Sequence, residues 1–560
     1  MPMMPQNITR PEAKNAVAQS YFSALLFGPV YHSIIIGNEC LVVEGDTIAG
    51  TYSDIAEIEK NGDYKIRYIE AGAIVIPGMS DSHVHSLEYG YSRSLPLDSA
   101  NTILGTSPPL PKISEAVTLV KEYILANPDI YANKSKIIEG WGWDKTIWPV
   151  EEYPTAADLE ADPVIRGRQV MLRSKDMHSS WVSQATLDAN APFPEEYEGG
   201  VIMRDEDGNP TGIFQDEAQS LIKPPNLTDD DLMRRFMVTV NDALKFGVTS
   251  MHDAGSTPGP LAFFQRQAAR APLPIRMYAM RFFNETWEYP SPVPSEGELK
   301  NRLNNKSIKI IGDGSLRSGG AYLFEPYTDD PTTVGFMRHS PELLKQRIPE
   351  LLSKGWQVNA HAIGDRANSE ILDAFEIAAN NGVDLRSLRP RIEHAQIMRQ
   401  ADIERMASLG VIASIQPTHA TDDMWYGEAR LGPERVKGLY AFRSIMNSGA
   451  RITTGSDIPV EGVNPLEGFY AAVTRVDRNG KSPHGPNGWF PEQKLTRLEA
   501  LRGMTIDPAY ASFSEDVLGS LEKGKKADFV VLSEDIMHIA EKEDIRSQGA
   551  CYSAGCIASY

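Results

Sequence analysis

The 560-residue sequence has little cysteine, no excess of basic side chains and no long apolar run. Its three cysteines, Cys40, Cys551 and Cys556, are too few for a disulfide framework, which predicts a reducing, cytoplasmic location. Acidic residues outnumber basic ones by 75 to 55, so the net charge of -20 excludes a broad basic surface for nucleic acid or anionic lipid. Polar residues interrupt the stretch 16–30, and we therefore expect neither a signal peptide nor a membrane-spanning helix.

The two ends of the chain have the pattern of a small β domain. Between about 22 and 72, short runs of β-branched residues alternate with turn residues, and 519–532 gives a turn followed by one more strand. Neither segment has a helical period. We predict that 1–72 and 506–560 together form a β-sandwich domain.

The long middle segment alternates buried strands with amphipathic helices, a pattern typical of an α/β fold with a parallel sheet. Helices are predicted at 367–380 and 400–408, each followed by a glycine that suits a helix end. Eight strand-helix units predict a (β/α)₈ TIM-type barrel over 73–505. The predicted strands are 73–78, 248–253, 275–281, 307–312, 356–361, 391–395, 411–416 and 451–455.

One segment is too long for a single strand-helix unit. Residues 86–245 follow the first predicted strand and include a turn-rich hairpin at 199–212. We therefore predict a large insertion after barrel strand 1, placed where it could shape a pocket.

Histidines and an aspartate stand at the ends of the predicted strands, where barrel enzymes build their sites. His83 and His85 follow the first run, and because strand side chains alternate, both lie on one face and can share a metal ion. His361 and His394 end the fifth and sixth strands, and Asp457 follows the eighth. Four of the 11 histidines thus lie at strand ends, which predicts a metal-dependent enzyme.

The ordered motifs resemble the amidohydrolase superfamily, specifically its amidohydrolase-3 (YtcJ-like) branch. Most of the chain takes part in the resemblance, and the ordered combination is far more specific than any one piece. The matching segments are 78–85, 247–255, 309–316, 361–367, 391–395, 455–459 and 519–532. The resemblance implies a metal centre, usually zinc, in the mouth of the barrel.

In the family's two-metal form, His83 and His85 would hold the first ion, and His361 and His394 the second. Lys309, which lies among isoleucines, would bridge both ions as a carbamate derived from carbon dioxide. A carbamate also avoids the cost of burying a charged ammonium. The alternative is a plain buried lysine beside a single metal ion.

Asp457 would ligate the first metal and contact the nucleophilic water. The resemblance implies attack of metal-activated hydroxide on a carbonyl, with Asp457 passing a proton to the leaving nitrogen. We expect a hydrolase of an amide-type, non-peptide carbon-nitrogen bond in a small-molecule substrate, in a chain that could form a homo-oligomer. The alternatives are a deaminase, a cyclic-amide hydrolase or a metal-dependent non-oxidative decarboxylase.

Further residues are candidates for contact with substrate. Asp313 and Arg317 follow the lysine strand, and Arg317 could meet an anionic group or make a plain loop salt bridge. Trp143 in the insertion and Trp425 after the seventh strand could wall an apolar pocket or simply pack. His252, in the second predicted strand, is expected in a structural or hydrogen-bonding role beside the ligands, with direct contact to the metal as the alternative.

Overall fold

Eight parallel strands form one nearly closed barrel in the computed structural model, which describes residues 23–24, 35–36, 40–52, 72–95, 97, 112–150, 152–292 and 301–539. The last strand meets the first, because Val84 and Ile458 form a parallel bridge and the N–H of Asp457 donates to the carbonyl of His83 at 2.8 Å. The predicted α/β TIM-type barrel is therefore confirmed. In sheet order the strands are β6 (Met79–Val84), β12 (Val248–Ser256), β13 (Arg276–Phe282), β14 (Leu303–Ile311), β15 (Gln357–Ala362), β16 (Arg391–His394), β17 (Ile412–Ile415) and β18 (Ile452–Thr454).

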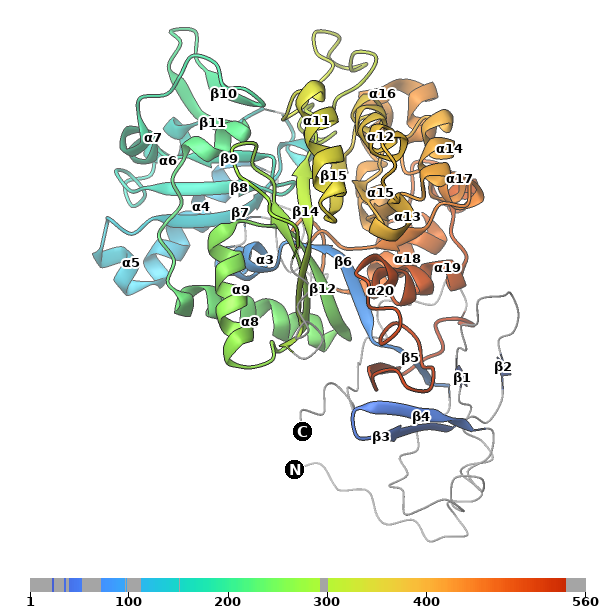
Figure 1. The fold of residues 1–560 in the computed structure, drawn as a ribbon. Coiled ribbons are helices and arrows are strands. Elements are labelled where there is room, and N and C mark those ends of the chain that lie inside the picture. The colour runs from blue at the N-terminus through green and yellow to red at the C-terminus, as the bar shows by residue number, and fades with distance from the viewer. Residues whose placement is uncertain are drawn as a thin grey trace.

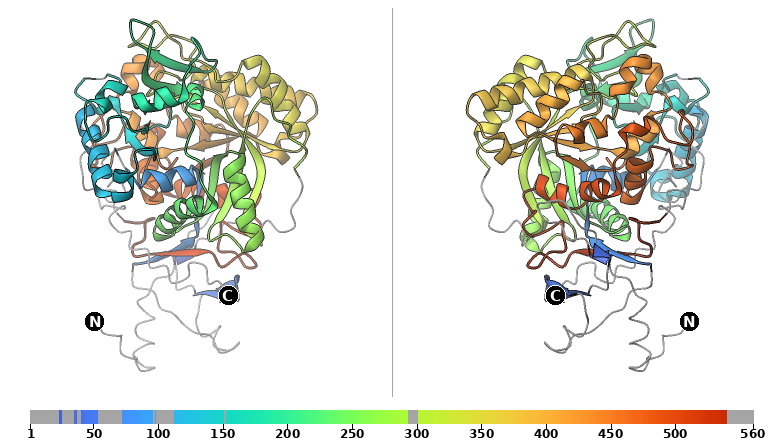
Figure 2. Two further views of the ribbon diagram at one scale, coloured as in Figure 1. Left: turned by 90° about the vertical axis from the view of Figure 1, so that its left-hand side faces the viewer. Right: turned by 90° about the vertical axis from the view of Figure 1, so that its right-hand side faces the viewer.

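Helices cover the outside of the barrel (Figures 1 and 2). α12 shows why they do so: Ala367, Ile371 and Phe375 recur at helical spacing and are all buried against the strands. α14 ends at Gly410, whose φ of 73° suits glycine. The covering helices include α8 (Asp229–Lys245), α9 (Pro258–Arg270), α11 (Pro341–Ser353), α12 (Asp365–Asn380), α14 (Gln400–Leu409), α17 (Phe442–Asn447), α18 (Pro465–Thr474) and α19 (Arg497–Gly503).

The first predicted barrel strand, 73–78, belongs to a different sheet. Its core, β5 (Ile74–Pro77), pairs antiparallel with β19 (Phe529–Leu532), and the barrel strand β6 begins only after Gly78. A Cβ on Gly78 would lie 2.5 Å from the Oγ1 of Thr249, so glycine is needed where the chain passes from one sheet to the other. An apolar run has the same pattern in either sheet, which explains the wrong strand boundary.

The two terminal segments meet below the barrel (Figure 1). β3 (Cys40–Glu44) and β4 (Thr47–Tyr52) form a hairpin, and the N–H of Ile48 donates to the carbonyl of Lys525 at 2.8 Å. A further short pair joins β1 (Ser23–Ala24) to β2 (Ile35–Ile36). Much of the predicted sandwich over 1–72 and 506–560 lies outside the described residues, so that domain stays a prediction.

A separate five-stranded sheet lies within the predicted insertion, in the order β10-β11-β9-β8-β7. Its strands are β7 (Ile138–Trp143), β8 (Val170–Ser174), β9 (Ser179–Val182), β10 (Gly200–Arg204) and β11 (Pro210–Asp216), and β10 with β11 is the predicted hairpin. Helices α4 (Ile113–Ala126), α5 (Pro128–Ala132), α6 (Ala156–Glu160) and α7 (Gln184–Asn190) accompany it.

The two flanks of this insertion belong to the barrel. α3 (Ser86–Ser92) and α8 pack together, and their apolar side chains share one cluster with β12. None of the helices in the described ranges combines the length and the apolar character that a bilayer crossing requires.

Candidate metal centre

Three buried side chains converge at the carboxyl ends of the barrel strands. The ligand atoms of His83, His394 and Asp457 all lie within 4.8 Å of one another. The Oδ1 of Asp457 is 3.4 Å from the Nε2 of His83 and 3.2 Å from the Nε2 of His85. Because metal-to-ligand bonds are about 2.0–2.2 Å for nitrogen and oxygen donors, a single ion could contact atoms at these separations after small shifts.

Lys309 and His361 extend this cluster. The Nζ of Lys309 is 3.4 Å from the Nε2 of His83, and the ring centroids of His361 and His394 are 4.5 Å apart. The rings of His83 and His394 are 4.9 Å apart. The structure thus brings together all six of the predicted metal-site residues.

The protonation states in this cluster suit a divalent cation. Burial lowers the pKa values of His83, His361 and His394 well below the usual range, which leaves neutral imidazoles with a lone pair to offer. Burial alone would raise the pKa of Asp457, but the neighbouring His83 and His85 outweigh it and lower that pKa below its usual range. The Nδ1 of His394 has no hydrogen-bond partner within the described part of the chain. Neutral imidazoles and a carboxylate are a donor set that zinc accepts.

The pKa values of His85 and Lys309 also depart from their usual ranges. Burial works against a charge on His85, but its hydrogen bond to Asp457 and the charge of that carboxylate raise the pKa of His85. Burial lowers the pKa of Lys309 to about 8, although Glu393 and Asp457 oppose the shift. A larger fraction of Lys309 is therefore a neutral amine near neutral pH than for an exposed lysine.

The backbone turns sharply where two of these side chains enter the cluster. His394 and Asp457 have φ values of 75° and 59°, and Ala395 follows with 45°. Non-glycine residues rarely adopt this left-handed region, and such strain persists where the surrounding structure enforces it. Here the turns aim the side chains at the ends of β16 and β18 into the mouth of the barrel.

Two buried charged side chains, Glu393 and Arg391, hold His83 in place on the side away from the cluster. The Oε2 of Glu393 lies 2.6 Å from the Nδ1 of His83, so that ring presents its Nε2 to the cluster. The Nε of Arg391 is 2.7 Å from Glu393, and its Nη1 donates to the Nδ1 of His252 at 2.9 Å. Of these, Glu393 and Arg391 were not predicted as functional residues. Their sequence context could have identified them, because two charged side chains lie two residues apart in the predicted strand 391–395.

His252 itself lies outside the ligand cluster within the part of the chain that the structure describes. Its bond to Arg391 agrees with the expected hydrogen-bonding role, one step removed from the ligands. His419, in α15 (Pro417–Asp423), was not predicted at all. Its ring stacks on His394 at 6.0 Å, and its Nε2 is 3.7 Å from the Oδ2 of Asp457. His419 lies four residues beyond the end of β17, so its position after a strand was a signal that could have identified it.

Asp313 is fully buried beside the cluster. Its carboxylate accepts hydrogen bonds from three backbone N–H groups of the loops that follow β14 and β15. Burial raises the pKa of Asp313 to about 7. Its Oδ1 is also 3.4 Å from the Nε2 of His361. The side chain thus holds two loops and one predicted ligand in place, and its contact with substrate stays a prediction.

Arg317 takes part in a partly buried ionic network. It pairs with Asp144 of the insertion, with Asp422 at 2.6 Å and with Asp423 at 3.4 Å. This geometry corresponds to the salt-bridge alternative, and it ties the insertion to α15, which follows β17. Steering of an anionic substrate by Arg317 stays a prediction.

The two predicted tryptophans lie in different surroundings. Trp143 is 3% exposed, stacks with Trp148, and donates from its Nε1 to the carbonyl of Leu172 at 3.0 Å, inside the core of the insertion. Trp425 is 54% exposed. Trp143 therefore packs inside the insertion. A substrate role for either tryptophan stays a prediction.

A histidine of the insertion lies nearer the cluster. The ring of His178 is 5.7 Å from that of His361, and its Nδ1 is 2.6 Å from the Oδ1 of Asp216. The insertion therefore does contribute side chains to the surroundings of the candidate centre.

A family model and known proteins match most of the length of this chain. A family model described as "Amidohydrolase family" matches residues 71–552. Protein LONG AFTER FAR-RED 3 of Arabidopsis thaliana is 33% identical over 512 residues, which cover 88% of this chain and 84% of the relative. Putative amidohydrolase YtcJ of Bacillus subtilis is 30% identical over 515 residues, covering 89% and 91%. N-substituted formamide deformylase of Arthrobacter pascens is 26% identical over 496 residues, covering 84% and 86%.

Solved structures give the same result. An uncharacterized metal-dependent hydrolase from Pyrococcus horikoshii matches with a TM-score of 0.67 and 27% identity, over 90% of this chain and 95% of the other. A second, from Pyrococcus furiosus, matches with a TM-score of 0.63 and 26% identity, over 89% and 95%.

Proposed function

The chain belongs to the amidohydrolase family, in its amidohydrolase-3 branch, and is a hydrolase of non-peptide carbon-nitrogen bonds; from this we propose that it cleaves the amide-type bond of a small organic molecule at a divalent metal centre. We assign zinc as the metal. The proposed ligands are His83, His85, Lys309, His361, His394 and Asp457.

One observation carries this proposal. Side chains from the ends of five separate strands meet in a single buried cluster, and the ligand atoms of His83, His394 and Asp457 lie within 4.8 Å of one another. Burying so many polar groups without a partner costs free energy, and a bound cation would offset that cost. A barrel used only as a scaffold has no need for such a set.

The chain's own residues supply orientation and proton transfer. A divalent cation held here would supply Lewis-acid activation of water and of a carbonyl oxygen. Glu393 holds His83 with its Nε2 toward the cluster. The Asp457 carboxylate accepts a proton from water and returns it to the leaving nitrogen, a step that amide cleavage needs because an amine anion leaves poorly.

We assign Lys309 the bridging role. Because burial lowers its pKa to about 8, the neutral amine that reacts with carbon dioxide is accessible near neutral pH. The product is a carbamate, which replaces a buried ammonium by an oxygen ligand and a negative charge. Density beyond the Nζ of Lys309 in a crystal structure would support the bridge, and a bare amine with two bound metal ions would contradict it.

The substrate class is proposed as an N-substituted amide. The relative from Arthrobacter pascens is named for deformylation of N-substituted formamides, and the alignment spans 84% of this chain. A formamide also places the least bulk beside the attacked carbon. Purified protein loaded with zinc should release amine from a panel of N-substituted formamides and acetamides. Protein with full metal content that is inert on the whole panel would refute this assignment.

Asp457→Asn gives the sharpest test of the proton-transfer step. The amide keeps the shape of the side chain but is a poor base, so kcat should fall by about 10²–10⁴-fold. Asp207→Asn, in the exposed β10–β11 hairpin, is the matched control and should leave kcat unchanged. Near-normal turnover by Asp457→Asn would remove Asp457 from the mechanism.

A further inference from the structure

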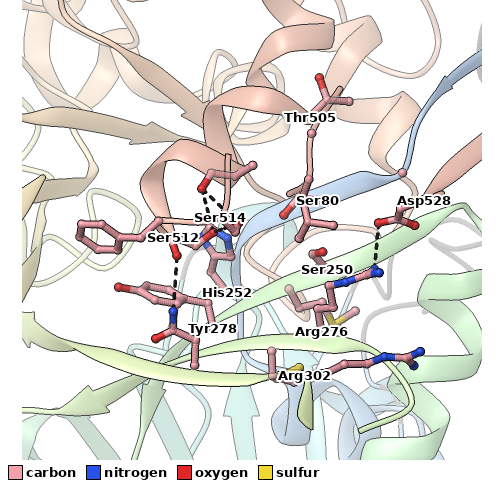
Figure 3. A pocket seen from close by; sticks show the side chains of 18 residues that line it. Ser80, Ser250, His252, Arg276, Tyr278, Arg302, Thr505, Ser512, Ser514 and Asp528 are labelled. Carbon is pink, nitrogen blue, oxygen red and sulfur yellow. Dashed lines mark hydrogen bonds and ion pairs between the residues drawn. The ribbon is translucent and has the colours of Figure 1, made fainter. Parts of the chain in front are cut away.

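A cavity lies at the opposite end of the barrel from the candidate metal centre. Its volume is about 220 Å³, and it opens among the amino ends of β6, β12, β13 and β14, beside α20 (Ile506–Ala511) (Figure 3). Barrel enzymes place their chemistry at the carboxyl ends of the strands, so a ligand here would not be the substrate of the metal centre.

The cavity is lined by hydrogen-bond donors. Ser80 is only 7% exposed, yet its hydroxyl makes no side-chain hydrogen bond within the described part of the chain, and the same holds for the hydroxyl of Ser250. Arg302 donates one N–H to the carbonyl of Leu273 at 3.1 Å. A guanidinium has five N–H groups, so several others can serve a ligand.

His252 adds a further donor, and the ring nitrogen that carries its proton can be deduced. A guanidinium only donates, so the Nδ1 of His252 must accept the hydrogen bond from Arg391, and the ring proton is on Nε2. His252 is 2% exposed and lines the cavity (Figure 3). Its Nε2 makes no hydrogen bond within the described part of the chain. This N–H borders the cavity, where an acceptor on a ligand would form a hydrogen bond with it.

The charge of the lining points to an anion. Arg276 is paired with Asp528 at 2.8 Å, and Figure 3 shows this pair at one side of the cavity. Arg302 then leaves a net positive charge among the charged side chains that line the cavity. Positive charge combined with hydroxyl and N–H donors matches the oxygens of a carboxylate, phosphate or sulfate group.

We propose that this cavity binds a small oxyanion and that the bound anion acts on the metal centre through His252. Observed contacts make up the whole route. His252 meets Arg391, Arg391 meets Glu393, and Glu393 lies 2.6 Å from the Nδ1 of His83. An anion that accepts from Nε2 makes Nδ1 a stronger acceptor, because linked hydrogen bonds polarise one another. The change reaches a predicted metal ligand through two side chains.

Sulfate is the probe for binding, because it keeps its charge over the working pH range. In calorimetry on the metal-loaded full chain, sulfate should bind saturably with one site per chain, and neutral sulfamide should bind at least about tenfold more weakly. Absence of saturable sulfate binding would overturn the proposal. This measurement needs no substrate, so its failure is distinguishable from failure of the proposed hydrolase activity.

Arg302→Gln locates the site. Loss of a charged donor should weaken sulfate binding by about tenfold or more. Arg234→Gln, an exposed arginine on α8 away from the cavity, is the matched control and should bind as the unaltered chain does. Should Arg302→Gln fold poorly, Ser250→Ala is the milder variant, with a several-fold loss expected. Unchanged affinity in the folded variants would show that sulfate binds elsewhere, including on the metal.

Chelator competition tests the connection to the metal. Sulfate should change the apparent dissociation constant of zinc several-fold in the unaltered chain and leave it unchanged in Arg302→Gln. Coupling between two binding sites is reciprocal, so zinc should change the sulfate affinity by the same factor. Sulfate binding without any change in zinc affinity would overturn the role of His252 as the link.

Discussion

The two ends of the barrel have opposite hydrogen-bonding character, although β6 and β14 contribute to both. At the carboxyl end, neutral imidazoles and the carboxylate of Asp457 offer lone pairs. At the amino end, the hydroxyls of Ser80 and Ser250 and the guanidinium of Arg302 offer protons. One end suits a cation and the other an anion. Ser80 and His83 are three residues apart in β6, about 10 Å at 3.3 Å per residue, and the alternation of strand side chains also places them on opposite faces.

In the middle of the barrel, charged side chains as well as apolar ones connect these two ends. Arg391 and Glu393 are fully buried, and they connect His252 on one side with His83 on the other. A buried ion pair is weak evidence for stability, because desolvation offsets the attraction. The Arg391–Glu393 pair instead orients the two histidines. It fixes which ring nitrogen His252 presents to the amino end and which one His83 presents to the carboxyl end.

His394→Ala should produce the largest change, and only at the carboxyl end. Removal of a proposed ligand from a buried cluster should weaken zinc binding by more than about a hundredfold, measured by chelator competition. Sulfate binding at the amino end should stay close to that of the unaltered chain. His538→Ala, at an exposed position, is the control. Unchanged zinc affinity in His394→Ala would exclude that side chain from the centre.

Glu393→Gln should have the next largest effect. The amide keeps the shape but holds the Nδ1 proton of His83 less strongly, so zinc affinity should fall by about 10–100-fold. Ser414→Ala removes another partner of Arg391, at 2.9 Å, without touching His83, and should change zinc affinity far less. Equal losses in the two variants would mean that Glu393 acts only by stabilising the fold.

His252→Asn should break the connection while preserving both sites. The shorter side chain can still accept from Arg391 but cannot present a donor in place of Nε2. Sulfate affinity should fall several-fold, and zinc affinity should no longer respond to sulfate. A response equal to that of the unaltered chain would show that the two ends communicate by another route.

The smallest expected effect is that of pH on the amino end. Burial, reinforced by the charge of Arg391, lowers the pKa of His252 well below its usual range. A group whose pKa is lowered in this way stays neutral from pH 6 to 8, so it gains no charge there. Sulfate affinity should therefore be nearly constant over that interval in calorimetry. A steep increase toward pH 6 would mean that His252 is protonated in the complex.

Patterns of apolar residues predicted the barrel well, because each strand and helix must bury one face in any arrangement. β12 to β18 lie where their runs predicted them, and the hairpin at 199–212 is present. The one misplaced strand, 73–78, shows the limit of this reasoning. Its apolar side chains are buried as expected, but against β19, and only the approach of two distant segments decides which sheet it joins.

The chain order of strand ends correctly indicated which side chains gather at one end of the barrel, and their role as metal ligands stays a prediction. Every strand of a barrel points the same way, so residues that follow strands must gather at one end. This placed His83, His361, His394 and Asp457 together before any contact was known. The same rule was not extended to His419, which lies in α15, four residues beyond the end of β17.

The sequence by itself determined the fold class, the family and the residue types at the mouth of the barrel, because these depend on periodicity and on the order of motifs along the chain. Only the tertiary structure decided that Glu393 and Arg391 connect His83 with His252, that Arg317 is held in an ionic network, and that a donor-lined cavity exists at the amino end. Such features depend on which side chains meet across strands separated by a hundred residues or more. No local pattern encodes that meeting, since it is set by the closure of the barrel and the packing of distant segments.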